Sequence, residues 1–485
     1  MLFQKLRKNT RGILIVIAIA FGASLFYTGA MAIMDRQRGK QELAANSIAL
    51  VNGEPISWAA YQENVYANLR YQEMMGARVN PLMVEAVKYN TVESLISQTL
   101  LLQEAKKQKI KVSRKEIDAK LSAIKESFPS AKEFQEQLRG SGLTEAQLRG
   151  YLKEQIQVEK LLDDLRNEVR ITEEEIVKAY EEVRPAHILV IPEDDTPEAK
   201  EQARQKVQEL AEQLRQGADF AELARAYSED VGSKEEGGDL GFVGRGRLVK
   251  EFEEAAFALE VGEISDVVET DYGFHVIKLL DRKLAEGDEF LEARDALAAE
   301  LKEQKVNNKI AEFVAELRDD SQVVIRDEQI IAHGLMREGN VDAAVEHYKA
   351  ALEGRPDDAY LRASLAQAYL EQDKTQEAIQ ELEQAVAQAD SDSQLHLMLG
   401  LAYLQADEED KGVESLLRAS EKSASDFLMQ IQISSILQRM GREEASVVED
   451  RIAEIQRLYE EQLKALQEAE GNQAEEETPE GSTAP

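Results

Sequence analysis

The first part of the chain combines a short apolar segment with a long stretch of helical periodicity. Residues 48–51 are apolar and are followed by the turn-forming pair Asn52-Gly53, which predicts a short strand ending in a turn. From there to about Glu182, apolar residues recur with the spacing of amphipathic helices. The positions with this spacing include Val92, Leu95, Ile96, Leu100, Leu152, Ile156, Leu161, Leu162 and Leu165. The pattern predicts a largely helical domain.

Two sequence signals in this domain mark the starts of helices. Ser113 stands three residues before Glu116, and Thr172 stands three residues before Glu175. In this capping-box pattern, the hydroxyl and the carboxylate each bond a backbone N–H that the helix leaves free. We therefore predict that one helix begins after Ser113 and another after Thr172.

The same domain continues after an inserted segment. A second amphipathic stretch precedes the apolar segment 323–325. We predict that 323–325 forms a strand that pairs with the strand at 48–51. The helical domain then comprises residues 46–183 and 284–326, and residues 184–283 are inserted into it.

The inserted segment begins and ends with alternating patterns that each contain a histidine. In the first, His187 shares one side with Leu189 and Ile191. In the second, residues 274–280, alternation groups His275 with apolar neighbours. Period-two alternation is typical of strands, so each histidine is expected on an apolar strand face.

Helix signals lie between these two strands. Thr196 and Pro197 have the form of an N-cap and a first helical residue, and Asp219 can cap the next helix. We expect helices at 197–217, 220–227 and 251–259 and further strands at 239–243 and 266–269. The inserted segment is therefore predicted to be a small sheet covered by helices.

From Asp327 onward the sequence repeats with a period of 34 residues, which is typical of tetratricopeptide repeats. Small residues keep this spacing at Ala332, Ala366 and Gly400, at Ala344, Ala378 and Gly412, and at Ala351, Ala385 and Ala419. We predict an array over residues 327–461, with three repeats and a fourth, capping unit from about Phe427. The acidic tail, 462–485, is predicted to be disordered.

The N-terminus contains a candidate membrane segment. Gly12 to Met34 are uncharged, and a helix of this length extends about 34 Å, enough to cross a hydrocarbon core of about 30 Å. Lysines and arginines precede it without acids, which favours a cytoplasmic segment at 1–11 and an anchor at 12–34. The alternative is a cleaved signal peptide, because Ala30-Met31-Ala32 has the form of a processing site.

Composition narrows the possible classes of function. The 485 residues carry a formal net charge of −35, which disfavours nucleic acid as a partner. The absence of cysteine excludes disulfides, thiol catalysis and cysteine metal sites. His333, His347 and His396 have no carboxylate spacing suited to a metal and are interpreted as structural.

Further motifs lie between the two histidine strands. Ser228-Glu-Asp230 and Gly237-Gly-Asp-Leu-Gly-Phe242 are preceded by Arg184-Pro-Ala-His187 and followed by Asp271-Tyr-Gly-Phe-His275. This order resembles the parvulin-type peptidyl-prolyl isomerases. The resemblance covers about a fifth of the chain and implies the parvulin fold for residues 184–283.

The resemblance also implies a site. His187 and His275 correspond to the paired histidines of parvulins, and Asp230 falls where the family carries Asp or Cys. Thr270 is expected to bond the histidines and to fix their tautomers. The residues in the positions of the family's proline pocket are Leu240, Leu248 and Phe252. The resemblance implies no cofactor and no metal.

Other interpretations of these residues are weaker. A lone histidine on an apolar strand is more often a core residue, but two that bracket both motifs favour catalysis. Gly237 to Gly246 lack the Gly-Lys-Ser/Thr ending of a phosphate-binding loop. Acidic residues follow Ile191 where phosphate-specific parvulins carry a basic cluster, so unphosphorylated X-Pro segments are the expected substrates.

The helical domain resembles the chaperone module of the SurA, PpiD and PrsA group, in which a helical domain carries an inserted parvulin domain. A helical spacer is the alternative. We therefore predict a multidomain, mostly α-helical protein. Its parts are an N-terminal transmembrane helix, a SurA-like chaperone domain, an α+β parvulin domain and a C-terminal α-solenoid of tetratricopeptide repeats.

The expected function is that of a prolyl isomerase and chaperone for unfolded exported polypeptides. It would be anchored in the inner membrane by a single span, with the bulk of the chain in the periplasm and a protein partner on the repeat array. Two alternatives remain open. One is a holdase that binds extended peptides without catalysis, and the other is a repeat-based scaffold for a membrane complex.

Overall fold

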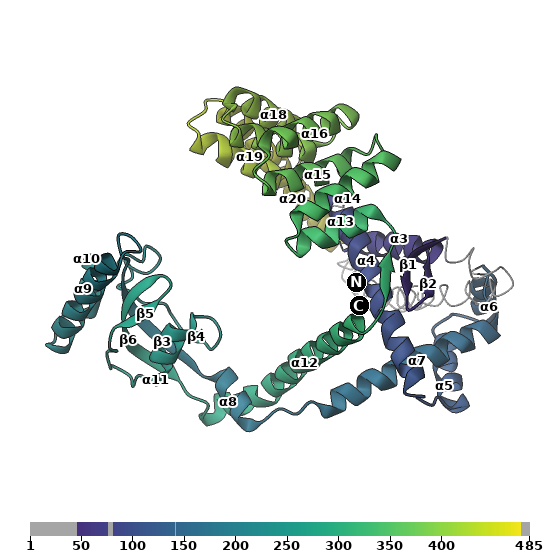
Figure 1. Cartoon of the computed structure of the whole chain (residues 1–485), viewed down its shortest axis with the longest axis horizontal. Helices are drawn as coiled ribbons and strands as arrows, with labels where there is room; N and C mark the ends of the chain where they lie inside the picture. Colours follow the sequence, from purple (N-terminus) through teal and green to yellow (C-terminus); the bar gives the residue numbers. More distant parts are fainter. Residues whose placement is uncertain (1–45, 76–80, 141, 477–485) are drawn as a thin grey trace, which may run out of the picture. The chain divides into compact units, whose positions relative to one another are not determined.

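The computed structural model describes residues 46–75, 81–140 and 142–476 and divides into two compact units (Figure 1). The first unit comprises Met1–Val158 and Glu316–Pro485, and the second comprises Glu159–Ala315. Within the described ranges, no helix is both long enough and apolar enough to cross a membrane. The predicted anchor at 12–34 lies outside the described residues, as does the segment 1–11.

The first unit has a small antiparallel sheet with the order β2-β1-β7. β1 (Ser47–Val51) and β2 (Glu54–Ser57) are joined by Asn52 and Gly53, whose φ angles are 51° and 79°. β7 (Val323–Ile325) pairs with the other edge of β1, with Ala49 opposite Ile325. The predicted pairing of segments far apart in the chain is confirmed.

Helices follow the first two strands along the chain, and the first two of these helices contact the sheet. They are α3 (Trp58–Met74), α4 (Pro81–Lys107), α5 (Arg114–Glu126), α6 (Ala131–Gly140) and α7 (Glu145–Glu168). The predicted capping box is present at the start of α5, since Ser113 Oγ accepts from Glu116 N and the Glu116 carboxylate accepts from Ser113 N at 2.7 Å. The buried face of β1 and residues of α4 form one core.

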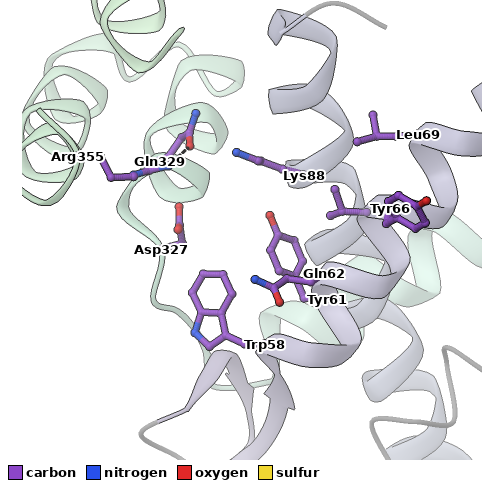
Figure 2. A pocket seen from close by; sticks show the side chains of 10 residues that line it. Trp58, Tyr61, Gln62, Tyr66, Leu69, Lys88, Asp327, Gln329 and Arg355 are labelled. Carbon is purple, nitrogen blue, oxygen red and sulfur yellow. Dashed lines mark hydrogen bonds between the residues drawn. The ribbon is translucent and has the colours of Figure 1, made fainter. Parts of the chain in front are cut away.

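The repeat array also belongs to the first unit and follows the 34-residue period. Its helices are α13 (Glu328–Arg337), α14 (Val341–Gly354), α15 (Ala359–Glu371), α16 (Thr375–Gln388), α17 (Ser393–Gln405), α18 (Glu409–Lys422), α19 (Phe427–Arg439) and α20 (Ala445–Glu476). A Cβ on Gly400 would lie 3.1 Å from Gly412 O. The recurring small residues therefore let paired helices approach closely. The first repeat helix, α13, packs against α4, and Asp327 and Gln329 lie near side chains of α3 (Figure 2).

The predicted disorder of residues 462–485 is wrong for residues 462–476, because α20 continues to Glu476. Glu, Ala and Gln dominate this stretch, and these residues have high helix propensity even without an apolar face. Earlier in α20, Arg457 and Glu461 also form an (i, i+4) ion pair of 3.9 Å. Residues 477–485 lie outside the described residues.

The second unit is built on an antiparallel sheet with the order β4-β3-β6-β5 (Figure 1). Its strands are β3 (Glu182–Val190), β4 (Val243–Gly244), β5 (Val268–Thr270) and β6 (Gly273–Lys283). Its helices are α8 (Glu173–Tyr180), α9 (Pro197–Arg215), α10 (Phe220–Tyr227), α11 (Lys250–Ala258) and most of α12 (Gly287–Asp319). Residues of α9 and α10 pack on one face of the sheet, and residues of α11 pack on the other.

The helix signals of this unit are confirmed. Thr196 caps α9 and Asp219 caps α10, each through its side-chain oxygen. The predicted strands are displaced, since residues 239–243 contribute only an isolated bridge at Asp239 before β4 begins. Positive φ angles at Gly237, Gly238 and Gly241 explain this, because they interrupt an extended backbone. The strand predicted at 266–269 begins two residues later, at Val268.

The second unit is larger than the predicted isomerase segment because helices on both sides of it pack together. Phe290 of α12 lies edge-on to Tyr180 of α8, with ring centroids 5.0 Å apart. Arg294 also pairs with Glu173 at 2.5 Å, across the same helices. The helices that precede and follow the sheet in the chain thus pack against each other.

Candidate active site

Neighbouring strands bring the two histidines together. On β3 and β6, His187 lies opposite Ile277, and Leu189 lies opposite His275. The histidines are thus diagonal neighbours on one sheet face. Their Nδ1 atoms are 3.1 Å apart, and their rings stack with an angle of 16° between planes. Both side chains are buried, with 7% and 4% of their surface exposed.

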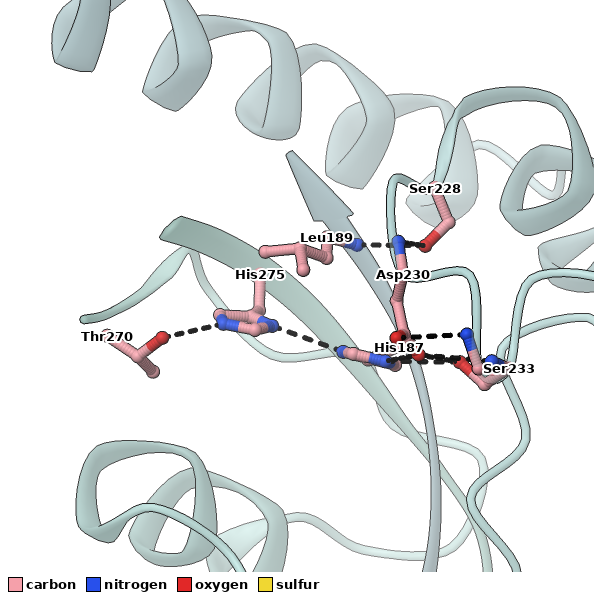
Figure 3. A network of polar contacts seen from close by, with 8 residues as sticks. His187, Leu189, Ser228, Asp230, Ser233, Thr270 and His275 are labelled. Carbon is pink, nitrogen blue, oxygen red and sulfur yellow. Dashed lines mark hydrogen bonds and ion pairs between the residues drawn. The ribbon is translucent and has the colours of Figure 1, made fainter. Parts of the chain in front are cut away.

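The outer nitrogen of each ring also has a partner, so four residues form a continuous polar chain (Figure 3). His187 Nε2 is 2.9 Å from Asp230 Oδ2, and His275 Nε2 is 2.8 Å from Thr270 Oγ1. The prediction that Thr270 bonds both histidines needs correction. Its hydroxyl reaches only His275, because β5 lies at the sheet edge beyond β6, on the side away from β3.

The donor and acceptor of each hydrogen bond in this chain follow from the Asp230 carboxylate at one end. An ionised carboxylate can only accept, so His187 donates from Nε2 to Asp230. A neutral His187 then accepts at Nδ1 from His275, whose Nε2 accepts from the Thr270 hydroxyl. The Tyr272 N–H donates to Thr270 Oγ1 at 3.1 Å. The hydroxyl hydrogen can point at His275 Nε2, 2.8 Å away, or at Gly273 O, 3.5 Å away, and the shorter contact favours His275. One tautomer of each ring satisfies every bond.

Electrostatics support this protonation pattern. Burial lowers the pKa of His275 to about 4, and the nearby His187 contributes to this while Asp230 opposes it. For Asp230, burial acts to raise the pKa, but hydrogen bonds from Ser233, His187 and the Gly232 backbone together hold the pKa at about 2. At neutral pH, His275 is therefore uncharged and Asp230 is ionised.

A tight loop after α10 positions the Asp230 carboxylate next to His187. Ser228 Oγ accepts from Leu189 N at 3.2 Å, and Glu229 N donates to Leu189 O at 2.8 Å. This fixes the loop along the edge of β3. Asp230 then accepts from Ser233 N at 3.1 Å and from the Ser233 hydroxyl. Sequence reasoning missed Ser233, although a serine three residues after an aspartate is a spacing at which the two side chains can bond.

The glycine pair after this loop holds the backbone of His187. His187 N donates to Gly238 O at 2.9 Å, and Gly238 has a φ of +84°. A Cβ at Gly238 would lie 2.2 Å from His187 O. Only glycine fits this approach. The glycine-rich segment therefore acts as a support for β3, and nothing in its contacts points to phosphate binding.

An apolar wall lies next to the histidines. The Phe252 ring lies edge-on to both histidine rings, with centroids 5.4 Å from each. Leu240 and Leu248 are partly buried and pack on the same cluster as Phe252. The structure thus brings all seven predicted site residues to one sheet face and its surroundings. Ile191, predicted on the same strand face, lies beyond the end of β3 and is 49% exposed.

The remaining histidines have partners in the first unit. His347 Nδ1 is 2.5 Å from Glu328 Oε2, and buried His396 bonds the Asp390 carbonyl at 2.9 Å. His333 Nδ1 is 3.8 Å from a carboxylate oxygen of Glu85. In the described part of the chain, no group of three or more His, Asp or Glu side chains could hold a metal ion.

Three family models match successive parts of the chain. A PPIC-type peptidyl-prolyl isomerase domain matches residues 169–283, a SurA-like N-terminal domain matches residues 2–162, and a tetratricopeptide repeat model matches residues 335–402. Together with the sheet and the paired histidines, these matches define a parvulin-type peptidyl-prolyl cis-trans isomerase with a SurA-like domain and tetratricopeptide repeats.

Individual relatives name the family. The foldase protein PrsA of Caldanaerobacter subterraneus is 33% identical over 328 residues, which cover 63% of this chain and 95% of the relative. The foldase protein PrsA of Geobacillus kaustophilus is 34% identical, over 51% of this chain and 81% of the relative. The chain belongs to the PrsA foldase family. A crystal structure of the peptidylprolyl isomerase PrsA from Bacillus cereus is 27% identical and covers 59% of this chain and 96% of its own, with a TM-score of 0.29.

Proposed function

We propose that His187, His275, Asp230 and Thr270 form the isomerase centre of this foldase and that an apolar pocket beside them binds the proline ring. The residues of that pocket are Leu240, Leu248 and Phe252. The observation that carries the proposal is the continuous hydrogen-bonded chain that lies edge-on to Phe252. It combines two buried histidines and two partly exposed polar groups, all of them partnered, with an apolar surface suited to a pyrrolidine ring.

The chemistry requires no bond to break. Rotation about the X-Pro bond must overcome a barrier of about 18–20 kcal/mol that arises from amide resonance. Resonance places negative charge on the amide oxygen, and water stabilises that charge. An apolar surface that excludes water favours the twisted amide, which has lost this charge separation, and only such a difference between the two states speeds rotation. The partly buried Leu240 and Leu248, which pack against the buried Phe252, supply that surface beside the site.

The polar chain positions the site and carries no proton to the substrate. Each histidine nitrogen already has a partner, and the pKa of His275, about 4, keeps its ring neutral at pH 7. The ionised Asp230 carboxylate adds a negative charge at one end of the chain. This charge disfavours the resonance form with a negative amide oxygen, which again favours the twisted state.

We further propose that the foldase acts outside the cytoplasm on exported polypeptides, with residues 12–34 as its membrane anchor and residues 327–461 as the docking site for a protein partner. The uncharged sequence of 12–34 and the family's foldase name support this. The intact mass of the protein from the membrane fraction tests it. A mass that includes residues 1–34 supports the anchor, whereas a mature chain that begins after Ala32 supports a cleaved signal peptide.

Exchange NMR on an unphosphorylated X-Pro peptide tests the isomerase centre. We expect residues 36–485 to accelerate cis-trans exchange and the Asp230→Ala and His275→Ala variants to be slower by at least tenfold. Lys302→Ala, on the exposed surface of α12 in the same unit, is the control and keeps the parent rate. Folded variants that retain the parent rate contradict the assignment of the site. Suppression of aggregation by the same variants would show that chaperone activity is separate from catalysis.

A further inference from the structure

A pocket in the first unit lies where α3 and α4 meet the first repeat helices. Its volume is about 330 Å³, and its lining comes from α3, from Lys88 of α4 and from the start of α13 and the end of α14 (Figure 2). All of these elements belong to one compact unit. The pocket therefore exists only because the repeat array packs on the helical domain.

One wall of the pocket is apolar and aromatic. Trp58, Tyr61, Val65, Tyr66 and Leu69 all belong to α3 and lie on successive turns. Tyr66 is 63% exposed, so the wall continues to the protein surface. Wide exposure of a large aromatic side chain at the mouth of a pocket is typical of a binding surface.

The opposite wall carries more positive than negative side chains. Lys88 and Arg355 are cationic, and Asp327 is the acidic residue of the lining. Asp327 is already used as the cap of α13, since its Oδ1 accepts from Ile330 N at 3.1 Å. Arg355 Nη1 donates to Gln329 Oε1 at 3.0 Å.

Lys88 is the cation with the most freedom to bind a ligand. It forms no hydrogen bond or ion pair with any described residue. Its nearest acidic neighbour on α4, Glu85, is buried behind the wall and bonded to Tyr348 at 3.3 Å and to Ser364. Burial raises the pKa of Glu85, which weakens its ability to neutralise Lys88. The pocket thus has a local positive charge in a chain of net charge −35.

A neutral hydroxyl completes the polar side. The Tyr61 side chain is 95% buried, and its hydroxyl forms no hydrogen bond with the described residues. Burial and the charge of Asp327 raise its pKa, although Arg355 opposes them. The hydroxyl therefore stays protonated and is available as a donor next to Lys88 (Figure 2).

We propose that this pocket is a second polypeptide-binding site, which takes an extended segment through one large apolar side chain and the carboxylate of a neighbouring Asp or Glu. The volume is at the small end for ligand pockets and suits a side chain rather than a folded surface. The aromatic wall takes the apolar group, and Lys88 with the Tyr61 hydroxyl takes the carboxylate. The proposal does not depend on the isomerase centre, which lies in the other unit.

Intrinsic fluorescence measures binding directly, because Trp58 is the chain's single tryptophan and lines the pocket. The probe is acetyl-Ala-Phe-Glu-Ala-amide, which contains neither proline nor a fluorescent indole. The matched peptide has Lys in place of Glu. We expect the full chain to show a saturable change of Trp58 emission with the Glu peptide and at least tenfold weaker binding of the Lys peptide. No saturable change, or equal affinity for both peptides, overturns the proposal.

Charge reversal in the protein provides the second arm. Lys88→Glu is expected to lower the affinity for the Glu peptide at least tenfold and to raise the affinity for the Lys peptide. A misfolded variant cannot produce this reversal. Lys107→Glu, on the same helix but outside the lining, is the control and keeps the parent affinities. His275→Ala also keeps them, which separates this site from the isomerase centre. Unchanged affinities in Lys88→Glu overturn the proposal. So does a tenfold preference for acetyl-Ala-Phe with a free carboxylate, because the site would then bind chain ends.

Discussion

Both units place a carboxylate beside a histidine and a hydroxyl, partly exposed in the second unit and buried in the first, yet the two clusters differ in what they can do. In the second unit, Asp230 accepts hydrogen bonds from four donor groups, and these hold its pKa at about 2 in spite of burial. In the first unit, burial raises the pKa of Glu85 more than its bonds to Ser364 and Tyr348 lower it. The same kinds of side chain therefore form a charged, polarised site in one unit and a helix-packing contact in the other.

The difference lies in the local backbone. Asp230 is surrounded by donors from its own loop, since Gly232 N and Ser233 N are two and three residues away in sequence. Glu85 meets partners on helices more than 260 residues later. Local donors stabilise the ionised carboxylate because the backbone of the same loop holds their N–H groups close to it. Distant hydroxyls satisfy a buried carboxylate and, in doing so, hold separate helices together.

The largest expected effect is from Gly238→Ala, which removes the backbone support of the charged site. The new Cβ would lie 2.2 Å from His187 O, and the residue would keep a positive φ that costs about 1–2 kcal/mol by itself. We expect the second unit to lose at least about 3 kcal/mol of stability, measured by hydrogen exchange of the β3 amides, and isomerase activity to fall at least a hundredfold.

Gly246→Ala is the matched control for this substitution. Its φ is +76°, but a Cβ there has no neighbour within 4 Å. Only the conformational cost of about 1–2 kcal/mol applies, and the His187 geometry stays intact. Similar losses in the two variants would show that the contact between Gly238 and His187 does not matter.

Glu85→Ala is expected to have the next largest effect, this time on the first unit. It leaves the buried Tyr348 hydroxyl and the Ser364 hydroxyl without their carboxylate partner, which we expect to cost about 2 kcal/mol. Urea unfolding followed by Trp58 fluorescence measures it, since Trp58 belongs to this unit. Glu353→Ala, an exposed position on α14, is the control. Unchanged isomerase activity in Glu85→Ala is expected, and a loss of activity would mean that the two clusters are coupled.

Sequence reasoning succeeded where one pattern determined the structure. The 34-residue period predicted the repeats, and the capping residues Thr196 and Asp219 gave the starts of their helices. The order of motifs predicted the four polar residues that the structure links in one hydrogen-bonded chain. These features depend on local spacing or on a family pattern, both of which are visible in the chain.

Other features depend on contacts that no local pattern shows. The Glu85 cluster joins helices that are far apart in sequence, and no sequence pattern indicates that they are in contact. In the sequence, its members are indistinguishable from other polar residues of helices. The reach of Thr270 to only one histidine follows from the strand order, which spacing alone does not determine. Helix α20 exceeded its predicted length because high helix propensity does not require an apolar face.

A fall in pH is expected to change the stability contributions of the two clusters in opposite directions. His275 has a pKa of about 4 in the folded state, below the ordinary 6.5, so the unfolded chain takes up the proton first. The contribution of His275 to stability is complete above pH 6.5 and falls by about 1 kcal/mol between pH 7 and 5.5. The pKa of Glu85 is raised, so its folded state takes up the proton first and its contribution increases as pH falls.

Variants isolate these contributions from those of neighbouring groups, which near Glu85 are His333 and the positive charge of Lys88. The stability difference between the parent and His275→Gln should shrink as pH falls from 7 to 5.5. The difference between the parent and Glu85→Gln should change with the opposite sign over the range in which Glu85 titrates. Hydrogen exchange of each unit measures both, and changes of the same sign would contradict the comparison.

Thr270→Val is expected to have the smallest effect and to sharpen the comparison most. Valine keeps the shape of threonine but cannot donate to His275 Nε2, a bond of 2.8 Å. The tautomer of His275 is then fixed only by its contact with His187. We expect a three- to tenfold loss in kcat/KM, in line with about 1 kcal/mol for one hydrogen bond, and Thr270→Ser should restore most of it. Nitrogen NMR of the histidine rings distinguishes positioning from packing, because a positioning role requires mixed tautomers at His275 in Thr270→Val. A single unchanged tautomer together with reduced activity would mean that Thr270 acts by packing alone.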